Sequence, residues 1–299
     1  MGEPSGIGPE IALAAFDHFG GKVGTHPLKL VGDAGIFSAH KGALIPTQAL
    51  VTAKPGKPDG ANAAAVTEAI EIAAAACLAG EAAAMVTAPI HKAVLNAAGF
   101  AFPGHTEFLA HLTGARRAVM MLASDQLRVV PLTIHIPLAD VPKAIDKQAV
   151  FDTGEIILTA LRRDFGIRNP RLAVAGLNPH AGEEGVLGDE DVSVIAPAIA
   201  ALKARGFAVR GPLSADTLFH EEARKTYDAA LCMYHDQALI PIKTLSFWGG
   251  VNVTLGLPIV RTSPDHGTAL DIAGRGKADP RSMIAAVQMA ADMADARSR

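Results

Sequence analysis

Three apolar runs decide the fold class of this chain: RVVPLTIH at 128–135, RLAVAGLNPH at 171–180 and YDAALCMYH at 227–235. Each run has the length and the Val, Ile, Leu and Ala content of a strand buried on both faces. Each also ends in a histidine, namely His135, His180 and His235. In an open α/β sheet, ligands bind beyond the carboxyl ends of the strands, so the three imidazoles are predicted to reach one rim.

A divalent metal ion is the ligand that three such histidines favour. Neutral imidazole binds first-row divalent ions, and three protein ligands leave one coordination position open for a substrate. The competing interpretation is a lone, hydrogen-bonded histidine at the polar end of each strand. That interpretation is preferred for any one of them, whereas the three together favour metal ligation. Zn²⁺, Mg²⁺, Co²⁺ and Mn²⁺ all suit three imidazoles completed by substrate oxygens.

The composition is that of an ordinary enzyme large enough for two domains. The 299 residues are 49% hydrophobic and 19% charged. A net charge of −3 and an aromatic content of 5% argue against a nucleic-acid partner. No apolar run approaches the ~18 residues that span a bilayer, so no membrane association is expected. The two cysteines, Cys77 and Cys232, lie in apolar segments and predict a reducing, cytoplasmic location.

Strand-like and helix-like segments alternate along the whole chain, which predicts an α/β fold with a largely parallel sheet. The predicted helices are 9–18, 61–78, 91–98, 106–113, 152–165, 194–205, 220–226 and 281–297. The predicted strands are 28–31, 83–87, 118–123, 127–135, 171–176, 228–234 and 251–257. Because no linker interrupts this alternation, two domains would have to be interleaved.

Two glycine-containing segments are candidates for anion binding. GEPSGIGPE at 2–10 precedes a helix and matches neither GxGxxG nor a P-loop, so a tight helix-entry turn is an equal alternative. In GHTEF at 104–108, Thr106 is a plausible N-cap. His105 would then lie at the helix N-terminus, where its neutral form is favoured and can donate to an anion. A capping turn with a solvent-facing histidine is the alternative.

Polar residues in the last third of the chain extend the predicted site. Asp236 is placed to orient the ring of His235. Lys243 suits neutralisation of a carboxylate or phosphate, or proton transfer, although an ordinary surface lysine fits its spacing as well. Asn252 interrupts an apolar run, and Arg261 closes that run and suits a bidentate grip on an anion. The Gly-rich stretch 265–277 that follows is a candidate to wrap a nucleotide.

Eight motifs together resemble the 4-hydroxythreonine-4-phosphate dehydrogenase (PdxA) family. They are MGEPSGIGPEI, TAPIHK, GHTEF, LNPHAGE, ADTLF, MYHDQ, GVNVTLGLP and RTSPDHGTALDIAGRGKAD, and they run from residue 1 to about 290. The last motif also resembles the NAD-binding loop of isopropylmalate dehydrogenases. One departure is that family members usually begin with a short strand before the first motif, whereas this sequence starts at it. Either translation starts upstream, or a sheet edge is exposed.

The resemblance assigns roles to the singled-out residues. The metal ligands would be His135, His180 and His235, with Lys243 and Asp236 beside them in catalysis. The substrate contacts would be His105, Thr106, Lys243, Asn252 and Arg261. The cofactor-binding residues would be Asp265, His266, Gly267, Thr268, Ala269, Asp271 and Gly274.

The resemblance also implies an architecture and a reaction. The fold would comprise two interleaved, isopropylmalate-dehydrogenase-like α/β/α domains, 1–102 with 245–299 and 103–244, with the active site in their cleft. A homodimer would share the metal site across its interface. The enzyme would use NAD or NADP to oxidise and decarboxylate 4-phosphooxy-L-threonine to 3-amino-2-oxopropyl phosphate in pyridoxal 5'-phosphate synthesis. A paralogue acting on D-threonate or D-erythronate 4-phosphate, a dihydrodiol dehydrogenase and a non-catalytic metal-binding protein are the alternatives.

Overall fold

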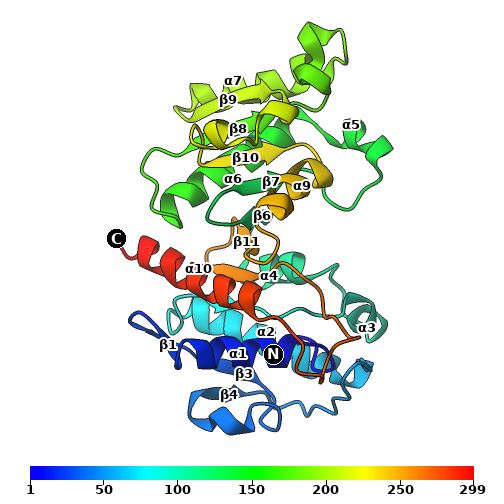
Figure 1. Cartoon of the computed structure of the whole chain (residues 1–299), viewed down its shortest axis with the longest axis vertical. Helices are drawn as coiled ribbons and strands as arrows, with labels where there is room; N and C mark the ends of the chain where they lie inside the picture. Colours follow the sequence, from blue (N-terminus) through cyan, green and yellow to red (C-terminus); the bar gives the residue numbers. More distant parts are fainter. The chain divides into compact units, whose positions relative to one another are not determined.

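A computed structural model describes all residues, Met1–Arg299, and divides the chain into two compact α/β units (Figure 1). Unit 1 consists of Met1–Ala118 with Val251–Asp295, and unit 2 of Val119–Gly250 with Ala296–Arg299. The chain passes from unit 1 to unit 2 after Ala118, returns to unit 1 at Val251, and ends in unit 2 with Ala296–Arg299. The α/β class predicted from the sequence is confirmed, while the predicted cleft stays a prediction.

Unit 1 contains the strands β5, β12 and β11 as neighbours in that order, and a separate parallel pair, β3 with β4. Strand β12 is parallel to β5 and antiparallel to β11. Helices α1 and α10 lie side by side (Figure 1) and share one apolar cluster. The elements are α1 (Gly8–His18), β1 (Lys22–Val23), β2 (His26–Pro27), β3 (Leu30–Gly32), η1 (Ser38–Ala43), β4 (Leu44–Pro46), η2 (Gly60–Asn62), α2 (Ala63–Leu78), β5 (Met85–Val86), α3 (Lys92–Ala97), α4 (His105–Thr113), β11 (Val251–Leu255), β12 (Arg261–Pro264) and α10 (Arg281–Arg297).

Unit 2 contains five neighbouring strands in the order β6, β7, β10, β8, β9. Strand β10 is parallel to both β7 and β8, and β9 is parallel to β8, whereas β6 is antiparallel to β7. The loops that follow β7, β10 and β8 therefore leave the sheet at one edge. The elements are β6 (Val119–Ala123), β7 (Arg128–Pro131), η3 (Leu138–Asp140), α5 (Val141–Ala144), α6 (Lys147–Arg163), β8 (Arg171–Ala175), η4 (Pro179–Gly185), η5 (Asp191–Ile195), α7 (Ala196–Ala204), β9 (Ala208–Leu213), η6 (Ala215–Thr217), α8 (Glu221–Arg224), β10 (Ala229–Cys232) and α9 (His235–Leu245).

Buried aliphatic side chains hold α6 against the strands of unit 2. Every residue of β10 is buried, and α6 buries Ile157, Leu158 and Leu161 almost completely. Full burial of each such side chain contributes about 1.5–3 kcal/mol. The helix begins five residues before the predicted start at residue 152, because the Asp146 carboxylate caps it by accepting a 2.7 Å hydrogen bond from the Ala149 amide.

The structure differs from the predicted secondary structure at four further elements. The strand predicted at 127–135 ends at Pro131, so His135 lies four residues beyond it. Helix α9 was missed because it contains Pro241. Strands β9 and β12 were missed because Gly211-Pro212 is typical of a turn and RTSP is polar. Proline is tolerated in β9 because that strand lies at the edge of its sheet.

Helix α2 with its preceding turn is long and apolar enough to cross a membrane, judged by the length and composition of Gly60–Leu78 alone. Part of this helix belongs to the core of unit 1, since 33% of the apolar window is buried. Val66 and Ile70 are buried in one cluster with Leu95 and Leu109.

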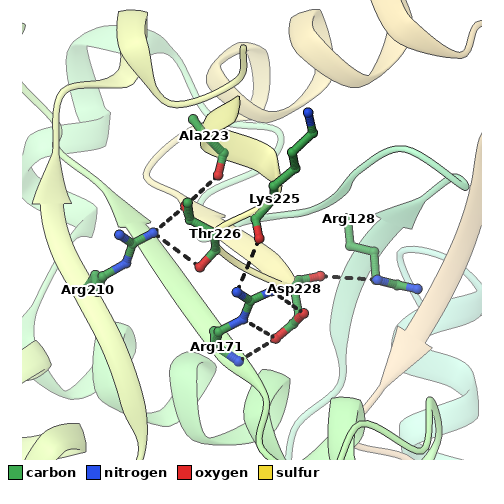
Figure 2. Close-up of polar contacts among 7 residues, drawn as sticks. All are labelled: Arg128, Arg171, Arg210, Ala223, Lys225, Thr226 and Asp228. Atoms are coloured by element: carbon green, nitrogen blue, oxygen red, sulfur yellow. Dashed lines mark hydrogen bonds and ion pairs between the residues drawn. The ribbon is translucent and has the colours of Figure 1, made fainter. Parts of the chain in front are cut away.

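A polar cluster ties the amino ends of three unit 2 strands together (Figure 2). The Asp228 carboxylate, just before β10, accepts hydrogen bonds from the Arg171 backbone amide at 2.7 Å and from its guanidinium at 3.0 and 3.2 Å. Arg128 on β7 donates to the Asp228 carbonyl at 3.3 Å. Burial alone would raise the pKa of Asp228, but the hydrogen bonds and charge of Arg171 outweigh burial and lower it.

An apolar cavity of about 660 Å³ lies in unit 1, lined by β3, β5 and helices α1, α2 and α10. Strand β3 pairs only with β4, and β5 only with β12. The Met1 ammonium donates to the Val31 carbonyl at 3.0 Å, and the Glu3 amide donates to the Pro89 carbonyl at 2.8 Å. Burial lowers the pKa of the Met1 amine to about 5. The first residues therefore connect β3 to the segment that follows β5, and Met1 and Gly2 line the cavity.

Asp228→Asn is expected to lower the free energy of unfolding at pH 7 by about 1–2 kcal/mol, because a charged hydrogen-bonded pair is lost. The folded-state pKa of Asp228 is lowered, so its contribution is present above the unfolded value near ~3.9 and disappears as pH falls through the folded value. Urea unfolding at pH 7, 5 and 3.5 measures this, with the exposed Asp189→Asn as the control. A difference between wild type and D228N that persists undiminished at pH 3.5 would contradict the assignment.

An apolar extension of five residues before Met1 is expected to raise Tm by roughly 5 °C or more, because it can pair with β3 and β5 and bury side chains in the cavity. A Gly/Ser extension of equal length is the matched control, since it also removes the buried amine but fills no volume. Differential scanning calorimetry of the three proteins gives the result. Equal Tm values for the apolar and the Gly/Ser extensions would show that the cavity does not accept a strand.

Candidate functional site

His135 and His235 form a pair at the carboxyl edge of the unit 2 strands. Their ring centroids lie 5.9 Å apart, and both line a pocket of about 300 Å³ together with Tyr234 and Leu138. His235 is the first residue of α9, and its Nδ1 lies 2.6 Å from Asp236 Oδ1. With the ring proton on Nδ1 donated to Asp236, the Nε2 lone pair of His235 is available to a metal ion.

His180 lies apart from this pair, in the turn η4 after β8. No group of three or more His, Cys, Asp or Glu side chains within the chain is arranged to hold a metal ion. The carboxylate that interacts with His180 is Asp216. Its pKa is lowered, mainly by the Ser214 hydrogen bond and to a smaller extent by the charge of His180. Asp216 lies in the quoted ADTLF motif, but nothing in its spacing singled it out.

The turn that carries His180 is left-handed. Every residue from His180 to Gly185 has a positive φ, between 43° and 95°. Four of these six residues are not glycine, and the left-handed conformation costs each L-residue about 1–2 kcal/mol. A Cβ on Gly182 would come within 2.9 Å of the Gly188 carbonyl oxygen, so the turn is also tightly packed.

The donors present fit a first-row divalent ion in chemistry. Two imidazoles on one tetrahedral ion have ring centroids roughly 5–6 Å apart, given metal–nitrogen bonds of about 2.1 Å. The separation of His135 and His235 falls in that range. The carboxylate on His235 Nδ1 is the outer partner that metal-bound imidazoles usually have. A third imidazole, from His180, would have to complete the set.

Unit 1 contains a buried cation that no carboxylate pairs with. Arg261 is 3% exposed and donates to the hydroxyls of Thr87, at 2.6 and 3.2 Å, and of Thr254, at 2.9 Å. Burial lowers its pKa to about 10, so it remains charged at neutral pH. Since neutral hydroxyls do not balance its charge, this guanidinium favours a bound anion.

His105 adds a neutral imidazole beside Arg261. It begins α4, and its Nε2 is buried without a hydrogen-bond partner. Its pKa is held well below the usual value, first by burial and then by the charges of Arg261, the Met1 amine and Lys92. A neutral ring at the amino end of a helix, among cations, is suited to a hydrogen bond with an anionic ligand.

The other predicted substrate residues lie in both units. Asn252 on β11 is two residues from Thr254, so its side chain is on the same face of the strand as the hydroxyl that holds Arg261. The buried Oδ1 of Asn252 has no hydrogen-bond partner. Thr106 is the second residue of α4 and is not its cap. In unit 2, the Lys243 ammonium lies 5.5 Å from the centroid of the Phe247 ring.

The predicted cofactor loop follows β12 without regular structure. His266, Gly267, Asp271 and Gly274 are exposed, and Asp265, Thr268 and Ala269 are half-buried. A Cβ on Gly267 would meet no atom within 4 Å, so backbone at this point is open to a ligand. An exposed, Gly-rich, polar loop of this kind is compatible with a dinucleotide.

The amino-terminal glycine segment packs against that loop. The Ile7 amide donates to the Thr268 carbonyl at 3.0 Å, and a Cβ on Gly6 would come within 2.7 Å of the same oxygen. Glu3 is buried and accepts from the Ser5 amide at 2.9 Å. These contacts favour the helix-entry turn over an anion site for residues 2–10.

Comparisons with known proteins identify the family of the chain. Residues 25–290 match the family described as pyridoxal phosphate biosynthetic protein PdxA. A 4-hydroxythreonine-4-phosphate dehydrogenase of Roseobacter denitrificans is 56% identical over 317 residues, covering 98% of this chain and 95% of that protein. A crystal structure of the enzyme of that name from Klebsiella pneumoniae covers 98% of both chains at 37% identity with a TM-score of 0.86.

A more distant structure shows the wider fold class. The β-decarboxylating dehydrogenase of Thermococcus kodakarensis is 16% identical, with a TM-score of 0.51 over 99% of this chain and 82% of its own. This likeness concerns the fold alone. Because the family match spans most of the sequence, and the Roseobacter relative is 56% identical over nearly all of it, the chain belongs to the PdxA family of pyridoxal phosphate biosynthetic proteins.

Proposed function

We propose that this protein is a 4-hydroxythreonine-4-phosphate dehydrogenase, an oxidoreductase that serves pyridoxal 5'-phosphate synthesis. The overall reaction converts 4-phosphooxy-L-threonine and NAD⁺ into 3-amino-2-oxopropyl phosphate, CO₂ and NADH. Membership of the family and the names of the similar proteins support this assignment.

The observation that carries the proposal is the buried, unbalanced charge of Arg261. Its guanidinium is 3% exposed and is held only by hydroxyl groups. Charge-assisted, bidentate hydrogen bonds to a phosphate or carboxylate would compensate it. A substrate with both anionic groups matches this requirement, whereas a neutral substrate would leave the cation unpaired.

The side chains have distinct tasks in this proposal. Arg261 and Lys243 supply positive charge to the phosphate or carboxylate, and His105, Thr106 and Asn252 supply hydrogen bonds that orient the substrate. His135, His180 and His235 would hold the divalent ion, Zn²⁺, Mg²⁺, Co²⁺ or Mn²⁺, with ligands contributed by both subunits of a homodimer. Asp236 keeps a proton on His235 Nδ1 and leaves Nε2 free to bind.

The loop 265–274 would hold NAD⁺, or NADP⁺, through its exposed backbone and polar side chains. When bound, the nucleotide accepts a hydride and the divalent ion stabilises developing negative charge on substrate oxygen. The protein groups contribute by binding and orienting the substrate, because the reactive chemistry belongs to the two bound groups. A cytoplasmic location fits the two cysteines in apolar segments, which are typical of a reducing compartment.

The assay that tests this function follows NADH absorbance with freshly prepared 4-phosphooxy-L-threonine and, separately, D-threonate 4-phosphate. Turnover is expected with the amino acid, and a chelator should abolish it until a divalent ion is restored. Faster turnover of D-threonate 4-phosphate would show that the enzyme carries out the same reaction in a different pathway. NADH from neither substrate, in metal-loaded protein, would contradict the enzymatic assignment.

Arg261→Met is expected to lower kcat/KM by about 30-fold or more, because a buried charge pair with the substrate is worth at least ~2 kcal/mol. Inorganic phosphate should raise the Tm of the wild type and not that of the variant. Thr87→Val is the matched variant, since it removes one hydroxyl acceptor but retains the guanidinium, and its loss should be smaller. An R261M protein with wild-type kcat/KM would remove Arg261 from the substrate site.

A further inference from the structure

A chain of buried hydrogen bonds links the three loops that carry the histidines of unit 2. It begins beyond β10, where the Met233 carbonyl accepts from Thr133 Oγ1 at 2.8 Å and from the Thr133 amide at 3.3 Å. Thr133 lies two residues before His135, and Met233 lies two residues before His235. The first two histidine loops are therefore fastened to each other at corresponding positions.

The side chain of Gln237 continues this chain to the third loop. Its Oε1 accepts from the Met233 amide at 2.7 Å, and its Nε2 donates to the Gly176 carbonyl at 2.8 Å. Gln237 is 8% exposed. The backbone hydrogen bonds between β10 and β8 stop where these strands end. Beyond that point, the side-chain amide of Gln237 connects the two segments instead.

Asp191 holds the segment that runs from Gly176 to His180. Its two carboxylate oxygens accept from the amides of Leu177, at 2.8 Å, and Asn178, at 3.0 Å, and Oδ2 also accepts from Asn178 Nδ2 at 3.1 Å. Asp191 is fully buried. His180 follows two residues after this anchored pair, at the start of the left-handed turn.

We propose that Gln237 is a positioning residue: its buried amide fixes the loop that carries His180 against the loop that carries His235, with Asp191 as the anchor of the former. Fully satisfied buried polar networks select one arrangement, because any other leaves donors and acceptors unpaired. An apolar side chain would fill the same volume without fixing the two loops to each other. The role in ligand binding rests on the proposed function.

The test is Gln237→Met, which conserves volume and removes both hydrogen bonds, with Gln148→Met on the exposed face of α6 as the control. Binding of Co²⁺, followed by its visible absorption, is expected to weaken about 10–100-fold in Q237M. The value of kcat at saturating Co²⁺ should recover to near the wild-type value. If Gln237 has only a structural role, Q237M will have a lower Tm, but its Co²⁺ affinity will stay within about 2-fold of the wild-type value. That result would overturn the proposal.

A second variant and a second readout keep the proposal separate from the proposed function. Asp191→Asn is expected to weaken Co²⁺ binding in the same way, and it substitutes for Q237M should that variant fail to fold. If the wild type itself binds no Co²⁺, the proposed function fails and amide hydrogen exchange decides the inference. Faster exchange at Leu177 and Asn178 in Q237M would uphold the link between the loops, and unchanged exchange would overturn it.

Discussion

The parallel pairing of β10 with both β7 and β8 is the constraint on which the arrangement of unit 2 depends. Parallel strands direct their following loops to one edge, so residues more than forty positions apart in sequence are brought to the same rim. The other edge carries the Asp228 cluster, in which charged side chains fasten the strand beginnings (Figure 2). The Arg171–Asp228 ion pair and the histidines His135 and His235 thereby lie at opposite edges of the strands, and the polar groups at the carboxyl edge take no part in that ion pair.

The two units differ in how their polar side chains are stabilised. In unit 2, the histidine side chains lie at the edge of the strands, where they are partly exposed, so their position matters more than the cost of burial. In unit 1, the difficulty is energetic, because the buried Arg261 guanidinium has lost its hydration and donates only to the hydroxyls of Thr87 and Thr254. That unit therefore carries an electrostatic cost, which the anionic substrate of the proposed function would offset. Burial first, and then the charge of Arg261, holds the pKa of His105 well below its usual value, so that a neutral hydrogen-bonding ring lies beside this cation.

The sequence predicts the features of this protein that follow from periodicity. Helix α10 occupies the predicted span, and β8 and β10 lie within their predicted runs, because their apolar pattern matches their burial. Strand β12 was not predicted because its buried residues Arg261, Thr262 and Ser263 are polar, and a hydrophobic pattern does not reveal them. Likewise, Gln237 and Asp191 act through atoms that only the folded chain brings together, so their spacing in the sequence carries no signal.

The left-handed turn at His180 is the feature that local sequence argues against most strongly. Four non-glycine residues with positive φ cost about 1–2 kcal/mol each, so the turn persists only because its surroundings determine it. The Asp191 carboxylate at its start and the close approach of Gly182 to Gly188 supply that determination. A relaxed loop of the same residues would be more stable locally and would carry His180 elsewhere. Backbone strain of this kind persists only where the surrounding structure fixes the chain, and here it fixes the position of His180.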